Sequence, residues 1–339
     1  VSAPSPRYAC WNGENHQFNT EHLISRPLFD AKLMEDLGSS NINLINGQVR
    51  SAQDSGHQWQ VIYQNQQTQK EIITGDYLVD ARGRTGPLKG DHQMRGPETV
   101  SLLQRWQTST TGNKHGNIAS MASSYRNGWA WIAKQGSKLY TQVTLSAHDH
   151  RIPKKAGLRQ FIASELGQIP EVVQWLESTL PTDNPVARAS TCRLSGNLVN
   201  QRLIRVGDAA LTADPLSGNG IFASLSLGLA APAVINTILD YPERASLAQQ
   251  FYRDKCLETF LRFCRTGRDF YALEQRWTDQ PFWQERRQWP DKQKLHKPFP
   301  PEQAQIKKRP ILAQGQTISK EVLIPPDHPL GLWRVAGIA

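Results

Sequence analysis

The segment Leu203–Leu225, which reads LIRVGDAALTADPLSGNGIFASL, constrains the fold of this chain more than any other. Its apolar start predicts a short buried strand, after which Gly207 allows a turn. Asp208 then lies at the carboxyl edge of a sheet, where open α/β folds bind ligands. A carboxylate there can accept hydrogen bonds from sugar-like hydroxyls. The glycine-rich turn leads into a helix, whose N-terminus favours anions and electron-rich oxygens.

Strand and helix patterns are interspersed along the whole chain. Runs typical of strands occupy 42–50, 59–64, 70–74, 77–80, 98–108, 119–125, 128–134, 139–146 and 202–206. Helical patterns cover 27–37 with Gly38 as a stop signal, and then 158–166, 170–180, 221–239 and 247–276. Residues up to about Glu21 are predicted to be irregular. The alternation favours an α/β or α+β fold over an all-α one.

The full string GDAAxxxxPxxGxG resembles the second FAD motif of the p-hydroxybenzoate hydroxylase-like flavoproteins. The resemblance implies FAD as cofactor and an FAD-binding domain of that fold. It assigns Gly207 to the turn and Asp208 to the ribityl hydroxyls. It places a six-residue loop against the isoalloxazine ring: Pro215, Leu216, Ser217, Gly218, Asn219 and Gly220. An ordinary strand, loop and helix is the alternative.

A second segment, Tyr77–Arg84, resembles the middle motif of the same family, a strand ending in Asp-Ala-x-Gly-Arg. The resemblance implies that four residues lie near the FAD diphosphate: Asp80, Ala81, Gly83 and Arg84. A strand followed by a basic turn is the alternative. Arg26 matches the arginine at the start of the family's next helix and is predicted to contact the flavin. Val49 is predicted to lie in the strand that borders the adenine.

Relatives begin with a strand, a GxGxxG loop and a helix that cradle the ADP diphosphate. The 339 residues contain no GxGxxG. Three explanations stay open: the chain is a fragment, the first unit lies outside this numbering, or the binding mode is shortened. In each case the chain carries the flavin-ring half of an FAD site and only part of the diphosphate side.

Gly128-Trp129-Ala130-Trp131-Ile132 resembles the Gly-Trp-x-Trp segment of flavin-dependent halogenases and their monooxygenase relatives. Two aromatic residues two positions apart on a strand share one face, so Trp129 and Trp131 are predicted to line the substrate pocket. Plain core packing is the alternative. The catalytic lysine of halogenases would fall in the absent N-terminal part, and no catalytic acid or base is assigned.

The tail 282–339 resembles the maturation flavoproteins of bacterial amine and amino-acid oxidases that carry a tryptophylquinone. That subgroup acts on a tryptophan side chain inside a partner protein. Much of the net charge of +9 lies in this region, at Arg286, Arg287, Lys292, Lys294, Lys297, Lys307, Lys308 and Arg309. A solvated tail explains these charges most simply. An acidic protein substrate, such as an oxidase precursor, is the functional alternative.

The four cysteines form no CxxC, so neither a zinc site nor a disulfide framework is predicted. The N-terminal residues do not read as a signal peptide, and we expect no apolar run to reach the roughly 20 residues that a membrane helix needs. We therefore expect reduced thiols in a cytoplasmic protein that binds neither nucleic acid nor a membrane.

These observations predict three regions. An FAD-binding domain comprises 1–97 and 181–245, a mostly antiparallel β-sheet substrate domain is inserted at 98–180, and 246–339 is a helical and irregular extension. The favoured function is FAD-dependent monooxygenation of an aromatic, indole-type substrate, with O2 and a reduced nicotinamide or flavin as electron donor. That substrate is expected to be a tryptophan side chain of a partner protein during tryptophylquinone maturation. A flavin-dependent halogenase of an indole or phenol, and a non-catalytic flavoprotein-like binding protein, are the alternatives.

Overall fold

The computed structural model describes residues 5–37, 42–84, 92–108, 120–293 and 305–324. The chain divides into two compact units. Unit 1 comprises Val1–Ile45, Pro97–Ser190 and Phe270–Arg287, and unit 2 comprises Asn46–Gly96, Thr191–Asp269 and Gln288–Ala339. Each unit is described by itself.

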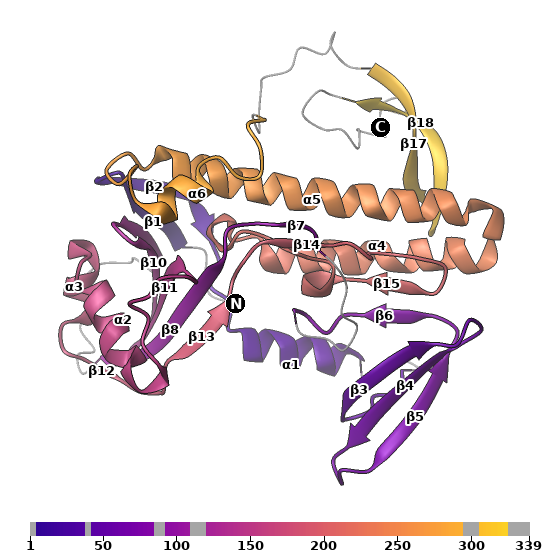
Figure 1. Ribbon diagram of the computed structural model, residues 1–339, viewed down its shortest axis with the longest axis horizontal. Helices are drawn as coiled ribbons and strands as arrows, with labels where there is room; N and C mark the ends of the chain where they lie inside the picture. The colour runs from indigo at the N-terminus through magenta and orange to yellow at the C-terminus, as the bar shows by residue number, and fades with distance from the viewer. Residues whose placement is uncertain (1–4, 38–41, 85–91, 109–119, 294–304, 325–339) are drawn as a thin grey trace. The chain divides into compact units, whose positions relative to one another are not determined.

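Unit 1 is built on an eight-stranded sheet (Figure 1) with the order β12-β8-β11-β10-β9-β1-β2, to which β13 is added beside β8. All pairs are antiparallel except β1 with β9. The strands are β1 (Ser5–Trp11), β2 (Glu14–Glu21), β8 (Thr99–Thr108), β9 (Ser120–Tyr125), β10 (Gly128–Gln135), β11 (Lys138–Ser146), β12 (Thr179–Pro181) and β13 (Val186–Ala189). The predicted antiparallel sheet is therefore present.

The predicted irregular start of the chain is wrong, because β1 and β2 form a hairpin whose first strand pairs with β9. Local sequence did not reveal these strands: Pro6, Asn12 and Gly13 read as turn residues. Asn12 and Gly13 form the hairpin turn, both with positive φ. Pairing with a strand more than a hundred residues away supplies the backbone partners that make this segment extended.

Helices α2 (Leu158–Leu166) and α3 (Pro170–Leu176) pack on one face of this sheet. Their buried residues, such as Ile162 and Val172, join strand residues such as Ile132 in one apolar core. A short helix α6 (Pro281–Arg286) completes the unit's C-terminal part. The predicted helix over 170–180 ends at Leu176 instead, because the next residues pair with β8 as β12.

Helix α1 (Arg26–Leu37) forms where the sequence predicts it, and the proposed stop residue Gly38 lies outside the described residues. Its apolar stripe is only partly covered, however: Phe29 and Leu37 are half-buried and none of its residues is fully buried. Leu28 is 74% exposed and Met34 is 51% exposed.

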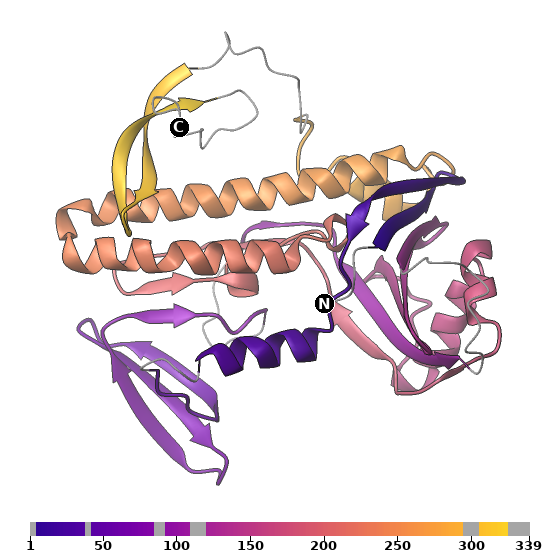
Figure 2. The same cartoon turned by 180° about the vertical axis from the view of Figure 1, so that it is seen from behind.

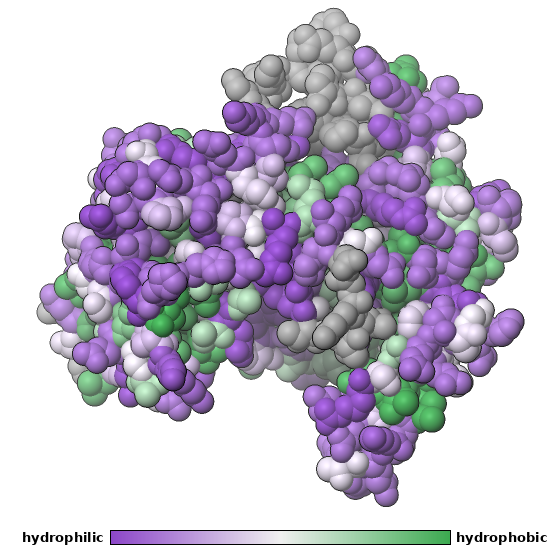
Figure 3. Space-filling view, in the orientation of Figure 1, coloured by the Kyte–Doolittle hydropathy of each residue, from purple (hydrophilic) through white to green (hydrophobic). Residues whose placement is uncertain are grey.

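Unit 2 contains several small sheets. The parallel pair β6 (Leu78–Asp80) and β15 (Leu203–Arg205) carries the two predicted motifs. Strands β7 (His92–Arg95), β14 (Arg193–Ser195) and β16 (Leu211–Thr212) form a second sheet. Strands β3 (Gly47–Asp54), β4 (Trp59–Asn65) and β5 (Lys70–Gly75) form a third. Ile72 of β5 is 64% exposed, and hydrophobic side chains gather over this third sheet in Figure 3.

The long helices α4 (Gly220–Asp240) and α5 (Ala245–Leu273) lie side by side in Figures 1 and 2 and enclose the unit 2 core; the last four residues of α5 count with unit 1. Leu227, Val234, Tyr252 and Phe260 are all fully buried there.

By length and composition α4 is apolar enough to cross a membrane. The expectation that no run reaches that length is therefore wrong. Its buried face packs into the core, which accounts for much of that apolar composition.

The C-terminal region is not wholly helical and irregular as predicted. Strands β17 (Gln305–Ala313) and β18 (Gln316–Ile324) form a hairpin that contacts α4, with Thr317 N donating to Thr237 Oγ1 at 2.7 Å. Part of the predicted basic tail, including Lys294, Lys297 and everything after Ile324, lies outside the described residues. The boundaries of the two units differ from those of the three predicted regions. In particular, β1 and β2 belong to the sheet of unit 1, although 1–97 was predicted to belong to the FAD-binding domain. The predicted functional domains stay a prediction.

Candidate functional site

The two motifs singled out in the sequence meet at one sheet edge in unit 2. Strands β6 and β15 are parallel, with Arg205 opposite Asp80, so their carboxyl ends lead out together. The turn after β6 carries Arg84, and the short 3₁₀ turn after β15 (Gly207–Ala209) carries Asp208. Arg84 Nε lies 3.4 Å from Asp208 Oδ2, although the two residues are 124 positions apart. Their side chains are 28% and 43% exposed, so both can also reach a ligand.

Asp80 has a different environment from Asp208. It is 4% exposed, its Oδ1 accepts from Arg82 Nε at 2.9 Å, and Arg205 Nε lies 3.8 Å from its Oδ2. Asp80 therefore holds the turn 81–84 in place from inside the unit. Arg82 Nη1 is buried, and no acceptor for it is found among the described residues.

Arg193 belongs to the same neighbourhood, although no motif singled it out. Burial lowers the pKa of its guanidinium, and the charge of Arg84 lowers it further, while Asp208 opposes that shift. Strand β14 places it there by pairing with β16, and Arg193 N donates to Thr212 Oγ1 at 3.0 Å. The edge thus gathers the cations Arg82, Arg84, Arg193 and Arg205 around the carboxylates Asp80 and Asp208. This positive excess, with a buried guanidinium N–H lacking an acceptor, fits an anion such as a diphosphate.

The predicted flavin-ring loop has a tightly determined backbone. Residues Pro215–Ser217 form a 3₁₀ turn, and Gly218 follows with φ of 68°, a left-handed conformation that glycine adopts without strain. Asn219 Nδ2 donates to Ser217 O at 2.6 Å, and α4 begins at Gly220. A helix start presents N–H groups that have no partner within the helix. A Cβ atom at Gly220 would meet none of the described residues within 4 Å, so these residues leave the space beside this helix start open.

Two further predicted cofactor residues lie elsewhere. Val49 is on β3, half-buried in the third sheet of unit 2 opposite Tyr63. Arg26 begins α1 in unit 1, where its Nε lies 3.3 Å from Asp30 Oδ1 and both side chains are more than half exposed. Val49 is therefore on a different sheet of unit 2 from β6 and β15, and the predicted flavin contact of Arg26 stays a prediction.

Trp129 and Trp131 lie on β10 with their side chains opposite the face that α2 and α3 cover. Across this second face of the sheet, Trp129 is aligned with Thr144 on one side and Ser124 on the other, and Ser101 is aligned with Thr144. The hydroxyl of Ser101 lies 3.2 Å from that of Thr144. Trp129 is 3% exposed, and its Nε1 has no acceptor among the described residues. Trp129 is therefore buried outside the α2–α3 core, and its place in a substrate pocket stays a prediction beside plain core packing.

A buried carboxylate at this face was missed by sequence reasoning. Glu274 is fully buried and its Oε2 accepts from Ser124 Oγ at 2.7 Å and from Arg276 Nη2 at 3.0 Å. Burial raises its pKa, but the hydrogen bonds from Arg276 and Ser124 outweigh this and hold the pKa below its usual range. Glu274 is therefore an ionised acceptor at neutral pH. Its short-range signal, Glu274-Gln275-Arg276 at a helix end, is too common to identify it.

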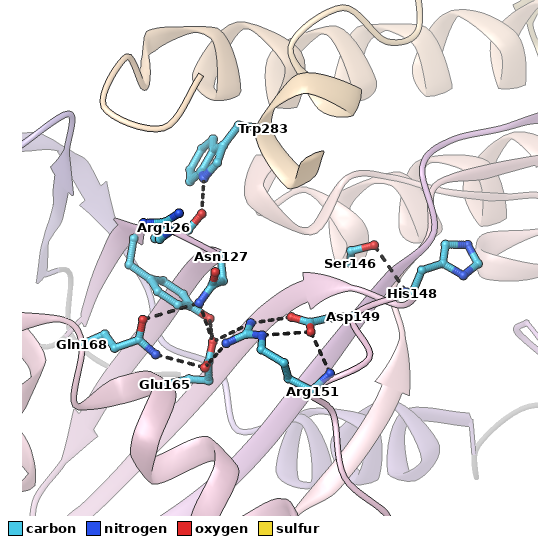
Figure 4. Close-up of polar contacts among 10 residues, drawn as sticks. Arg126, Asn127, Ser146, His148, Asp149, Arg151, Glu165, Gln168 and Trp283 are labelled. Atoms are coloured by element: carbon cyan, nitrogen blue, oxygen red, sulfur yellow. Dashed lines mark hydrogen bonds and ion pairs between the residues drawn. The ribbon is translucent and has the colours of Figure 1, made fainter. Parts of the chain in front are cut away.

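A second buried acid, Glu165, lies on the other side of the sheet (Figure 4). Its carboxylate accepts from Tyr125 Oη at 2.9 Å, from Arg151 Nη1 at 2.9 Å and from Gln168 Nε2 at 3.0 Å. Burial and the charge of Glu165 raise the pKa of Tyr125 well above its ordinary value. Tyr125 ends β9, Arg151 follows β11 and Gln168 follows α2, so the network ties α2 to the sheet. We therefore assign it to the architecture and not to the site.

No family model matches the chain. The solved structure of QhpG, a peptidyl tryptophan dihydroxylase essential for tryptophylquinone cofactor biogenesis, is 41% identical with a TM-score of 0.84, covering 99% of this chain and 76% of that one. The flavin-dependent halogenase CmlS is 14% identical with a TM-score of 0.77, covering 95% and 73%. It shares the fold.

A curated relative shows the same kinship in sequence. LodB of Marinomonas mediterranea, whose name assigns it to the FAD-dependent oxidoreductases, is 29% identical over 236 residues. The match covers 67% of this chain and 60% of LodB, so the chain spans about three fifths of that relative's length.

Proposed function

Because the chain belongs to the flavoprotein family that includes QhpG and LodB, we propose that it is an FAD-dependent monooxygenase that hydroxylates a tryptophan side chain of a partner protein during tryptophylquinone maturation. The observation that carries the proposal is the 41% identity with QhpG over 99% of this chain. It gains support from the sheet edge of unit 2, where Arg84 and Asp208 meet beside the open start of α4.

In this proposal the sheet edge of unit 2 holds the cofactor. Asp208 accepts hydrogen bonds from ribityl hydroxyls, while Arg84 and Arg193 attract the diphosphate. The loop Pro215–Gly220 would lie against the isoalloxazine, and the N-terminus of α4 would favour an anion or an electron-rich oxygen there. Asp80 and Ala81 shape the turn that presents Gly83 and Arg84. When bound, a reduced flavin supplies the activation of O2 for oxygen transfer to an electron-rich aromatic ring.

The second face of the unit 1 sheet is the proposed substrate surface. Trp131 is half-buried and would offer flat apolar area to an aromatic side chain, and the buried Trp129 would support it from the same face of β10. No side chain is assigned as general acid or base, because binding the ring and excluding water are the roles that these residues can fill.

The partner is a protein, and we propose that it is an acidic one. Lys307, Lys308 and Arg309 follow one another on β17, and Arg309 is directly opposite Lys320 on β18. Like charges in opposite positions repel each other, so an acidic surface would relieve this repulsion. O2 and a reduced nicotinamide or flavin complete the reactants. We place the protein in the cytoplasm, in keeping with four buried cysteines that form no disulfide.

The decisive experiment combines the protein, FAD, a chemical or enzymatic reductant and O2 with the precursor subunit of a tryptophylquinone oxidase. The expected result is a mass increase of one or two oxygen atoms on a precursor tryptophan, located by peptide mass spectrometry. An unchanged precursor in the presence of reduced flavin and O2 contradicts the proposal. Product that contains bromine or chlorine when halide is added would instead identify a halogenase.

A further inference from the structure

Asp214, which directly precedes the proposed flavin-ring loop, makes an unusual number of contacts to it. Its Oδ1 accepts from Leu216 N at 2.9 Å. Its main-chain oxygen accepts from Ser217 N at 3.0 Å and from Ser217 Oγ at 2.7 Å. The residue is 8% exposed. One aspartate thus determines the backbone of the turn that leads into α4.

The other carboxylate oxygen of Asp214 faces a buried thiol. Cys192 Sγ donates to Asp214 Oδ2 at 3.7 Å, within the range of a sulfur hydrogen bond. The interaction with Cys264, burial and the charge of Asp214 all raise the pKa of Cys192 well above its ordinary value. The thiol therefore stays protonated and can serve as the donor to Asp214.

Helix α5 reaches Asp214 only because residue 267 is glycine. A Cβ atom added at Gly267 would lie 2.7 Å from Asp214 Cγ and 3.0 Å from Asp214 Oδ2, which is too close for either group to stay in place. Alanine usually stabilises a helix relative to glycine, so a glycine in the middle of α5 calls for a local reason. The close approach of Asp214 supplies that reason. Gly228 of α4 offers a contrast, since nothing lies within 4 Å of its added Cβ.

From these contacts we infer that Asp214 is a positioning residue for the flavin, held by Cys192 and by the close approach of α5 at Gly267. Fixed backbone dipoles stabilise a ligand more than mobile ones, because no energy is spent on orienting them at the moment of binding. Asp214 supplies that rigidity to the loop Pro215–Gly220. The inference rests on the proposed function, in which that loop contacts the isoalloxazine.

The test measures FAD affinity by flavin fluorescence, the visible spectrum of the bound flavin and its midpoint potential in the full chain. We expect Asp214→Ala and Gly267→Ala each to weaken FAD binding on the order of tenfold, and to shift the flavin absorption band. Gly228→Ala is the matched control, because it makes the same change in a neighbouring helix where there is room. It should leave affinity and spectrum as in the wild type.

Two substitutions at Cys192 test whether the thiol helps to hold Asp214. They also keep the inference testable if Asp214→Ala does not fold. Cys192→Ser retains a donor and should bind FAD within about twofold of the wild type, whereas Cys192→Ala should bind severalfold more weakly. Wild-type affinity, spectrum and potential in both Gly267→Ala and Cys192→Ala would overturn the inference. If the wild-type chain itself takes up no FAD, the proposed function fails instead. If the wild type binds FAD and Asp208→Ala loses it while Gly267→Ala and Cys192→Ala keep it unchanged, the proposed function stands and only the inference about Asp214 fails.

Discussion

Two ion-paired acids of this protein, Glu165 in unit 1 and Asp208 in unit 2, have opposite surroundings. Glu165 is 2% exposed, and Tyr125, Arg151 and Gln168 all donate to its oxygens. Asp208 is 43% exposed and pairs with Arg84 at 3.4 Å, in a neighbourhood with more arginines than carboxylates. The difference shows how a structural acid can be told from a ligand-binding one. An acid whose carboxylate oxygens all accept hydrogen bonds from the protein stabilises the fold. An acid with exposed carboxylate oxygens, in a neighbourhood where arginines outnumber carboxylates, can bind a ligand.

The largest effect is expected from removing the buried acid. Glu165→Ala leaves the buried Tyr125 hydroxyl without its acceptor and removes one of the two carboxylates that pair with Arg151, so it should lower the free energy of unfolding by about 2–4 kcal/mol. Urea denaturation of the flavin-free protein measures it. FAD affinity should stay within about twofold of the wild type. The exposed Glu177 at the end of α3 is the matched control, and Glu177→Ala should change stability by less than about 0.5 kcal/mol. A small loss in Glu165→Ala would contradict the architectural role.

Asp208→Ala should show the reverse pattern. The loss of a charged acceptor is expected to raise the dissociation constant of FAD by about ten- to a hundredfold, measured by fluorescence titration. The free energy of unfolding without FAD should change by less than about 1 kcal/mol, because the pair with Arg84 is partly exposed and screened by solvent. Asp240→Ala, at the far end of α4, makes the same change outside the site. An equal loss of affinity in both variants would count against Asp208 as a ligand residue.

Glu274, a second buried acid of unit 1, extends the comparison because its contribution to stability should depend on pH. Its pKa in the folded protein lies below the ordinary value of 4.5, so ionised Glu274 stabilises the fold above about pH 4.5. That stabilisation is lost as pH falls through the folded pKa. We expect Glu274→Gln to be about 1–3 kcal/mol less stable than the wild type at neutral pH, and the gap to narrow in acid. Denaturation curves between neutral pH and about pH 3 measure this, and a gap that stays constant would be the contrary result.

Arg26 is expected to show the smallest stability effect. Its pair with Asp30 is more than half exposed on both sides, so Arg26→Ala should change the free energy of unfolding by less than about 0.5 kcal/mol. The predicted flavin contact makes a separate claim, namely that the same variant binds FAD severalfold more weakly. Asp30→Ala breaks the same ion pair and is the control. If Arg26→Ala and Asp30→Ala bind FAD equally well, the predicted contact of Arg26 is excluded.

Much of the architecture could be predicted because its signals are local. The alternating runs that predicted β8, β10 and β11 became those strands within one or two residues, and α4 and α5 formed where the apolar periodicity placed them. Strands β1 and β2 could not be predicted in this way. Their residues read as a loop, and their extended conformation depends on the distant strand β9. The hairpin β17–β18 could not be predicted either, because its proline and glutamine residues interrupt the alternation of apolar and polar residues that is typical of a strand.

The candidate site likewise has parts that local sequence determines and parts that depend on tertiary contacts. The sequence by itself determined the strand, the turn at Gly207, the loop Pro215–Gly220 and the helix that follows, because neighbouring residues encode their own backbone preferences. Only the tertiary structure decided that Arg84 lies beside Asp208, that Arg193 joins them, and that Trp129 faces away from the core beneath α2 and α3. It also decided that Gly267 lets α5 approach Asp214. These contacts join residues far apart in the chain, so strand pairing and helix packing had to form before any of them could exist.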